Sequence, residues 1–178
     1  IDFRRNQYKG KYIVIEGIDG SGKSTQAKLV SEAIRAKGIT VLQTSEPNTH
    51  DAIGNLIRDV LSGKEKISSV AIQYLFSANR ATTHEEIIIP ALTRGETVLS
   101  HRCFWSAVAY GIVDRHVEGP VEEVLRQAQD ETGKQMLIAQ SILSMYHQFI
   151  IPDYTFYLDI SGVVDQLKFL NAIGCVGR

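Results

Sequence analysis

The sequence predicts an α/β fold of three layers, in which a mainly parallel sheet is covered by helices on both faces. Four short segments rich in β-branched and aromatic residues alternate with longer segments whose apolar residues have helical spacing. Strand–helix–strand repetition implies right-handed crossovers, which leave helices on both sides of a parallel sheet. No linker rich in proline, serine or glycine divides the 178 residues, so we expect one domain over residues 1–178.

Each expected strand is a short apolar run bounded by glycine, proline or a charged residue. The four runs are Tyr12–Glu16, Thr40–Thr44, Thr97–Ser100 and Thr155–Asp159. The dipeptide Glu46-Pro47 ends the second run, and the polar residues from Asn48 to Asp51 can cap the helix that follows.

Four segments have the apolar spacing of helices. They are Lys23–Lys37, Asp51–Leu61, Ser69–Arg94 and Val121–Phe149. We expect a break at Pro90, because proline lacks the N–H that a helix interior uses. We also expect an interruption of the last helix at Gly133, because glycine is a poor helix former.

The composition excludes several classes of function. The formal charge is −1, from 19 basic and 20 acidic residues, and no block of lysine or arginine suggests binding to nucleic acid. The cysteines Cys103 and Cys175 are too few for a disulfide framework, which indicates a reducing, cytoplasmic compartment. No apolar run approaches the roughly 20 residues of a membrane span, and no apolar leader opens the chain, so we expect no membrane association.

The stretch IEGIDGSGKST, residues 15–25, predicts a phosphate-binding loop. Gly17, Gly22, Lys23 and Ser24 fit the pattern G-x-x-x-x-G-K-[ST] between an expected strand and an expected helix. Backbone N–H groups and the helix N-terminus favour phosphate oxygens, the lysine adds a positive charge, and the serine hydroxyl suits Mg²⁺. The alternative is a glycine-rich turn without a ligand. The residues expected at a nucleoside triphosphate are Gly17, Asp19, Gly20, Ser21, Gly22, Lys23, Ser24 and Thr25.

Other proteins with such a loop carry further motifs that this sequence lacks. A GTPase needs an Asn-Lys-x-Asp guanine reader, which is missing, and the D-x-x-G of residues 130–133 lies in a polar helical region. A transporter ATPase needs Leu-Ser-Gly-Gly, whereas residues 61–64 read Leu-Ser-Gly-Lys. A kinase of small substrates remains.

Polar groups follow three expected strands, at the edge where open α/β sheets bind ligands. The phosphate-binding loop follows the first strand. Arg102 follows the third strand, where a positive charge at a helix start is unfavourable unless an anion is present. Glu46 and Pro47 follow the second strand.

Phe76 and Arg80 share a helix face, where a ring can stack on a base and a guanidinium can donate hydrogen bonds to an oxygen. The alternative is a core phenylalanine and an arginine that caps a helix or pairs with a glutamate.

With these residues in place, the sequence resembles the thymidylate kinases of the nucleoside monophosphate kinase group. The resemblance runs from Tyr12 to about Lys168. It depends on the ordered blocks IVIEGIDGSGKSTQAKLV, SEPNTHDAIGNLIRDVL, LFSANRATTHEEIIIPALTRGETV and RCFWSAVAY, followed by PDYTFYLDI. It implies a P-loop kinase fold, transfer of the γ-phosphoryl group of ATP to dTMP, Mg²⁺, a closing lid and a homodimer.

The resemblance also implies a role for individual residues. Lys23 and Ser24 would contact ATP and magnesium, and Asp19 would lie near the phosphate and sugar hydroxyl of the acceptor. Phe76 would stack on thymine and Arg80 would contact that base. Arg102 would bind the acceptor phosphate, and Tyr110 would lie where a 2′-hydroxyl would go. The expected catalytic residues are Lys23, Arg102 and Asp19, with Ser24 at the metal and Glu46 and Pro47 beside the substrate.

Several residues depart from the family pattern. His101 stands where an aspartate is usual, which weakens the expected magnesium site unless Asp19, Glu16 or Asp159 replaces it. The other departures are Ser45 for arginine, Gly111 for glutamine, Ala107 for a base-reading amide and Gly20 for a P-loop arginine. Thymine specificity is therefore less firmly implied than kinase chemistry.

The last part of the family pattern is missing. Val163–Leu170 resembles the helix before the lid, with Lys168 where arginine is usual, but the sequence ends at Arg178. We therefore expect this domain to lack the lid and the C-terminal strand. Besides a dTMP kinase, two alternatives stay open: a deoxynucleoside monophosphate kinase of broader specificity that uses dUMP or dGMP, and a nucleotide-binding protein with impaired catalysis.

Overall fold

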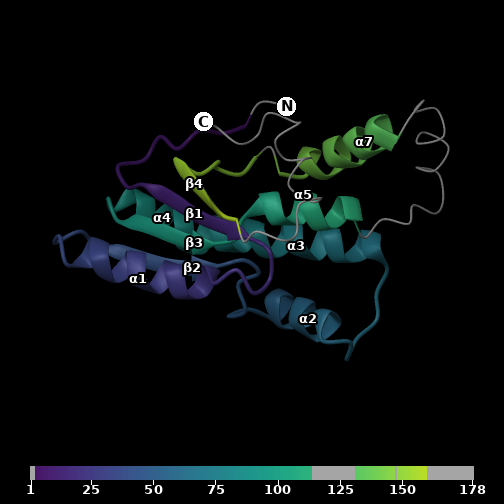
Figure 1. Ribbon diagram of the computed structural model, residues 1–178, viewed down its shortest axis with the longest axis horizontal. Helices are drawn as coiled ribbons and strands as arrows, with labels where there is room; N and C mark the ends of the chain where they lie inside the picture. The colour runs from purple at the N-terminus through teal and green to yellow at the C-terminus, as the bar shows by residue number, and fades with distance from the viewer. Residues whose placement is uncertain (1–2, 114–130, 147, 160–178) are drawn as a thin grey trace.

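A parallel sheet of four strands in the order β2-β3-β1-β4 forms the centre of the fold (Figure 1). The computed structural model describes residues 3–113, 131–146 and 148–159. The strands are β1 Tyr12–Gly17, β2 Val41–Ser45, β3 Thr97–His101 and β4 Tyr154–Leu158. The helices are α1 Lys23–Arg35, α2 Ala52–Leu61, α3 Ser69–Thr83, the π-helical η1 His84–Ile88, α4 Ile89–Thr93, α5 Phe104–Val113 and α7 Glu131–Ser144.

Side chains from β1 enter two separate cores, one on each face of the sheet. Tyr12 and Val14 belong to a cluster that includes Phe104 of α5 and residues of α4 and α7. Ile15, on the opposite face, packs with Ala27 of α1. Because successive residues of a strand point to opposite faces, this alternation places helices on both sides of the sheet. The predicted three-layer α/β fold is confirmed.

The expected strands agree with the observed ones to within one residue at either end. The capping prediction for the second helix is also confirmed, because Asp51 is the N-cap of α2 and accepts a hydrogen bond from the Gly54 N–H at 2.6 Å. The turn after β2 therefore stops the strand and starts the helix with the same few residues.

The expected break at Pro90 is wrong in its position and its nature. The chain stays helical from α3 through η1 to α4, and the wider π-helical turn His84–Ile88 ends two residues before Pro90. Pro90 occupies the first turn of α4, where a missing N–H costs little. The helix therefore changes type ahead of the proline and does not end there.

Gly133 is the third residue of α7, and residues 114–130 lie outside the described residues, so the expected interruption at Gly133 stays a prediction. The remainder of the predicted segment Val121–Phe149 before Glu131 lies outside the described residues, as do Val163–Leu170 and Cys175. Within the described parts of the chain, no helix is long and apolar enough to cross a membrane.

Candidate functional site

The loop between β1 and α1 has the backbone of a phosphate cradle. Gly22, directly before α1, has a φ of 84°, a left-handed conformation that glycine adopts without strain. No side chain caps the first turn of α1, so its N–H groups face outward at the positive end of the helix. Ser24 and Thr25 are exposed in that turn. The predicted P-loop thus has the shape that anions favour at a helix N-terminus.

Lys23 is held inside this loop. Its ammonium group donates to the Ile18 carbonyl at 2.6 Å and lies 3.9 Å from the Asp19 carboxylate, and the side chain is 8% exposed. Burial, and then the positive charge of Arg102, lower the pKa of Lys23, while Asp19 and Glu16 oppose that shift. Two cations from different elements therefore approach one another, an arrangement that a bound anion would stabilise.

Arg102 lies in the turn between β3 and α5 and has a φ of 73°, uncommon for a residue with a side chain. Its guanidinium forms an ion pair with Asp19, donates to Ser106 Oγ at 2.9 Å and reaches the Tyr110 hydroxyl at 3.4 Å. The Tyr110 hydroxyl also lies 3.3 Å from Asp19. Asp19 thus joins the P-loop to Arg102 and Tyr110, which the sequence only placed at the same edge of the sheet.

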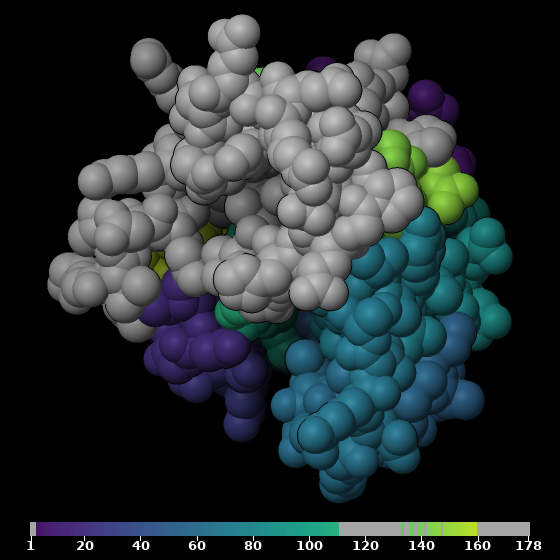
Figure 2. Space-filling model, turned by 90° about the vertical axis from the view of Figure 1, so that its right-hand side faces the viewer, coloured from purple at the N-terminus to yellow at the C-terminus, as the bar shows by residue number. Residues whose placement is uncertain are grey.

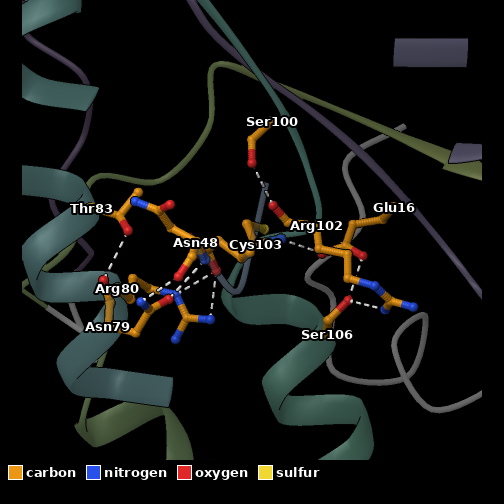
Figure 3. A network of polar contacts seen from close by, with 10 residues as sticks. Glu16, Asn48, Asn79, Arg80, Thr83, Ser100, Arg102, Cys103 and Ser106 are labelled. Carbon is orange, nitrogen blue, oxygen red and sulfur yellow. Dashed lines mark hydrogen bonds and ion pairs between the residues drawn. The ribbon is translucent and has the colours of Figure 1, made fainter. Parts of the chain in front are cut away.

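Glu16, the buried residue before Gly17, supports this turn (Figure 3). One carboxylate oxygen accepts from the Cys103 N–H at 2.8 Å and the other accepts from Ser106 Oγ at 2.7 Å. The sequence offered Glu16 only as a substitute metal ligand. In the structure the two oxygens hold Cys103 and Ser106 at the start of α5, and with them the turn that contains Arg102.

Arg80 forms a buried ion pair with Glu46. The Glu46 Oε2 atom lies 2.7 Å from Nε and 2.6 Å from Nη2, and the guanidinium lies 4.4 Å from the centre of the Tyr146 ring. Burial raises the pKa of Glu46, and the Arg80 charge opposes that shift. Arg80 therefore pairs with a glutamate, one of the alternatives that the sequence left open. It also lines the pocket described below.

The segment after β2 is fastened to α3 by the residue that precedes Arg80. Asn79 accepts from the Asn48 N–H at 2.9 Å and donates to the Asn48 carbonyl at 2.8 Å. Gly54 is pressed against the same carbonyl, since a Cβ atom there would lie 1.7 Å from the Asn48 oxygen. These contacts hold the segment of Glu46 and Pro47, which forms one wall of the pocket described next.

A pocket of about 240 Å³ brings together all the residues predicted for the acceptor substrate. These are Asp19, Glu46, Pro47, Phe76, Arg80, Arg102 and Tyr110. Figure 2 shows a hollow between the purple region of α1 and the blue region of α2 and α3. The pocket therefore runs from the Asp19–Arg102 pair, beside Lys23, to the Arg80–Glu46 pair.

Several residues that line the pocket were not expected from the sequence. They are Leu61, Ile72, Gln73, Cys103 and Ser106, whereas Ala107, named above where a base-reading amide is usual, also lines the pocket. Gln73 had a signal, because it lies three residues before Phe76 and seven before Arg80, on the same helix face. Leu61 had none, since its place depends on how the end of α2 packs.

His101 and Ser45, which depart from the family pattern, are partners in the register of β2 and β3. Both line a second cavity of about 540 Å³ beside β2, away from Phe76 and Arg80. Burial, and then the charges of Arg102 and Lys23, lower the pKa of His101. The imidazole is therefore neutral at neutral pH and adds no third positive charge beside Lys23 and Arg102.

Among the residues that the structure describes, no three His, Cys, Asp or Glu side chains gather as a metal site. A magnesium ion that accompanies a nucleotide needs no such cluster, because substrate phosphates and water supply most of its ligands. Ser24, exposed in the first turn of α1, is the residue placed to contribute a hydroxyl.

Comparison with known proteins identifies relatives in sequence and in fold. A family profile described as thymidylate kinase matches residues 15–167. The probable thymidylate kinase of Pyrococcus horikoshii is 46% identical over 107 residues, which cover 57% of this chain and 52% of that protein. The thymidylate kinase of Chlorobium limicola is 33% identical over 149 residues, which cover 84% of this chain and 60% of that protein. The chain thus spans about half the length of the first of these relatives and three fifths of the second.

Two solved structures share the fold over nearly the whole chain. The thymidylate kinase of Candida albicans has a TM-score of 0.70 and 25% identity, with 97% of this chain and 80% of that chain covered. The thymidylate kinase of Ehrlichia chaffeensis has a TM-score of 0.62 and 26% identity, with 92% and 82% covered. With the family profile matched over most of its length, the chain belongs to the thymidylate kinase family.

Proposed function

We propose that the protein transfers the γ-phosphoryl group of ATP to dTMP. The observation that carries this proposal is the position of Asp19, which lies between the P-loop lysine and the acceptor pocket. Its carboxylate is 3.9 Å from Lys23 and forms an ion pair with Arg102. A donor phosphate at Lys23 and an acceptor phosphate at Arg102 would therefore lie side by side, as in-line transfer requires.

The residues of the P-loop fit the triphosphate of ATP. The uncapped first turn of α1 offers N–H groups, and the buried Ser21 hydroxyl has no hydrogen-bond partner within the described part of the chain. Lys23 would bind phosphate oxygens, and Ser24 would hold Mg²⁺. When bound, Mg²⁺ neutralises charge on the phosphates.

The acceptor pocket fits a nucleoside monophosphate. Arg102 would bind its phosphate, Phe76 would stack on its base and Arg80 would donate to the base, with Tyr110 and Asp19 near the sugar. No general base is needed, because the attacking phosphate oxygen is already anionic. The work of Lys23 and Arg102 is to align donor and acceptor and to stabilise charge that develops between them.

Broader specificity is a second candidate, and Ala107 favours it. Its methyl group lines the pocket and offers no hydrogen bond to a base. The Candida albicans enzyme, which shares this fold, is described as having broad substrate specificity. The protein would then be a deoxynucleoside monophosphate kinase that also accepts dUMP or dGMP.

The test is ADP release from ATP and Mg²⁺ with dTMP, dUMP, dCMP, dGMP and UMP, with Lys23→Ala as the blank. Turnover greatest on dTMP supports the first candidate, and comparable turnover on several monophosphates supports the second. Nucleotide binding without turnover on any of them contradicts both and leaves the impaired nucleotide-binding protein.

Two proposals concern the whole protein, the first motivated by the family resemblance and the second by the composition of the sequence. We infer that it acts as a homodimer and works in the cytoplasm, without nucleic acid or membrane partners. Light scattering of the full-length gene product tests the dimer. The same product shows whether a lid and a further strand follow the domain of residues 1–178.

A further inference from the structure

Three side chains that line the acceptor pocket each carry a buried polar atom without a hydrogen-bond partner among the described residues. The atoms are Glu46 Oε1, Gln73 Oε1 and Arg80 Nη1. Buried polar atoms in native proteins are nearly always paired, because an unpaired one carries its full desolvation cost. One end of this pocket is therefore suited to a polar ligand edge that both accepts and donates hydrogen bonds.

Gln73 differs from Glu46 and Arg80 because it has no hydrogen bond to another side chain among the described residues. Glu46 and Arg80 already bond each other, whereas no hydrogen bond is found for Gln73 within the described segments. Its side chain is 4% exposed, on α3. Gln73 lies one turn before Phe76, and Arg80 lies one turn after it, so the three share a helix face. A base stacked on Phe76 would have a glutamine on one side and an arginine on the other.

The two groups select for a particular chemistry. An arginine only donates hydrogen bonds, so Arg80 favours a base with a carbonyl oxygen that accepts them. A glutamine carries an acceptor oxygen, which suits a ring N–H. A carbonyl beside a ring N–H occurs in thymine, uracil and guanine, whereas cytosine and adenine present an amino group beside a bare ring nitrogen at that edge. Ala107 supplies neither kind of group.

We propose that Gln73 determines base specificity by accepting a hydrogen bond from the ring N–H, while Arg80 donates to a neighbouring carbonyl. This inference rests on the proposed monophosphate kinase function and adds a residue to it. Gln73 does not touch the reacting phosphates, so it acts on binding of the acceptor and leaves the rate of phosphoryl transfer nearly unchanged.

A structural role and a specificity role predict opposite results when the amide is removed. Gln73→Met keeps the length of the side chain and replaces an unpaired amide with an apolar group beside Leu61 and Ile72. The free protein should then keep or gain thermal stability, because a buried unpaired oxygen is gone. Affinity for dTMP should fall, because the ring N–H loses its acceptor.

The experiment compares wild type, Gln73→Met and the control Tyr74→Phe, which changes the exposed neighbouring residue on α3. Calorimetry measures Kd for dTMP and for N3-methyl-dTMP, which lacks the ring N–H, and steady-state assays with ATP give KM and kcat. We expect Gln73→Met to raise Kd and KM for dTMP by about 10-fold, with kcat within about 2-fold and Tm not lowered. N3-methylation should cost wild type about 10-fold and cost the variant little more, because the same hydrogen bond is already lost.

Each other outcome overturns the inference in a distinguishable way. If wild type phosphorylates dTMP and Gln73→Met binds it equally well, the role of Gln73 is wrong and the proposed function stands. If Gln73→Met lowers Tm and weakens dTMP and its N3-methyl analogue equally, Gln73 is structural. If wild type neither binds nor phosphorylates any monophosphate, the proposed function and this inference fall together.

Discussion

Glu16 and Ser106, which lie 90 residues apart in sequence, are joined by a hydrogen bond of 2.7 Å from the serine hydroxyl to the buried carboxylate. The same hydroxyl accepts a hydrogen bond from Arg102 at 2.9 Å. The end of β1 therefore sets the position of the guanidinium proposed to bind the acceptor phosphate. Glu16 is a positioning residue, because it acts on the substrate only through Ser106 and the turn before α5.

Glu16→Gln should raise KM for dTMP by about 5- to 10-fold and change KM for ATP less. The amide keeps an acceptor for the Cys103 N–H but turns a donor toward Ser106, so that hydroxyl loses its acceptor and holds Arg102 less firmly. Steady-state kinetics with each substrate varied in turn make the measurement. Ser106→Ala should show the same split between the two KM values, and equal changes in both would contradict the positioning role.

Lys23→Ala should lower kcat on the order of 100-fold or more, because a positive charge placed at the transferred phosphoryl group acts mainly on the transition state. Single-turnover and steady-state rates with dTMP measure the loss. Lys28→Ala, at an exposed position of α1, is the matched control and should retain wild-type rates. A near-normal kcat for Lys23→Ala would refute the role of this lysine.

Arg80→Met should destabilise the protein by about 3 kcal/mol or more, because it leaves the Glu46 carboxylate buried without its cation. Urea unfolding measures the loss. The double variant Arg80→Met with Glu46→Gln should recover much of it, since no buried charge remains, but neither variant should bind dTMP as wild type does. A single variant that loses less than about 1 kcal/mol would mean that solvent reaches the pair.

His84 should make stability depend on pH on the acid side of neutrality. The ring is buried beside Tyr12 and Phe149, and burial, followed by the charges of Arg80 and Arg4, lowers the pKa of His84 to about 3. The folded state thus binds fewer protons than the unfolded state, whose histidine titrates near 6.5. The contribution is complete above about pH 6.5 and is lost as pH falls toward 3, by up to about 1.4 kcal/mol per pH unit.

Free energies of unfolding measured between about pH 7 and pH 4 test this slope. His84→Phe removes the titrating group and should flatten the curve in that range. An equally steep curve for His84→Phe would assign the acid sensitivity to other groups.

The fold could be predicted from sequence because its signals are local. Apolar runs, helical spacing and the P-loop pattern each span a few consecutive residues, and the strands followed to within one residue. The error at Pro90 has a tertiary cause. The π-helical turn ahead of Pro90 depends on packing against neighbouring elements, which no local pattern records.

The residues expected at the acceptor could be placed in one pocket because three strand ends meet at one edge of a parallel sheet. Two features of that pocket could not be found. The left-handed backbone of Arg102 has no sequence signature in a residue with a side chain. Glu16, which holds the turn of Arg102 from outside the pocket, is the next-to-last residue of β1, and its partners are distant in sequence. Gln73 could have been found from the sequence, because it lies one turn before Phe76 on the helix face that Phe76 and Arg80 share.

The hydrogen bonds that Asn79 and Arg80 make to the segment after β2 have a thermodynamic consequence. That segment loses its conformational freedom when the chain folds, so this wall needs no further ordering when a nucleotide arrives. A rigid wall favours rapid association whose rate depends on charge attraction to Arg102 more than on rearrangement. The association rate constant for a monophosphate should therefore fall with increasing salt. It should depend on solvent viscosity no more steeply than diffusion does.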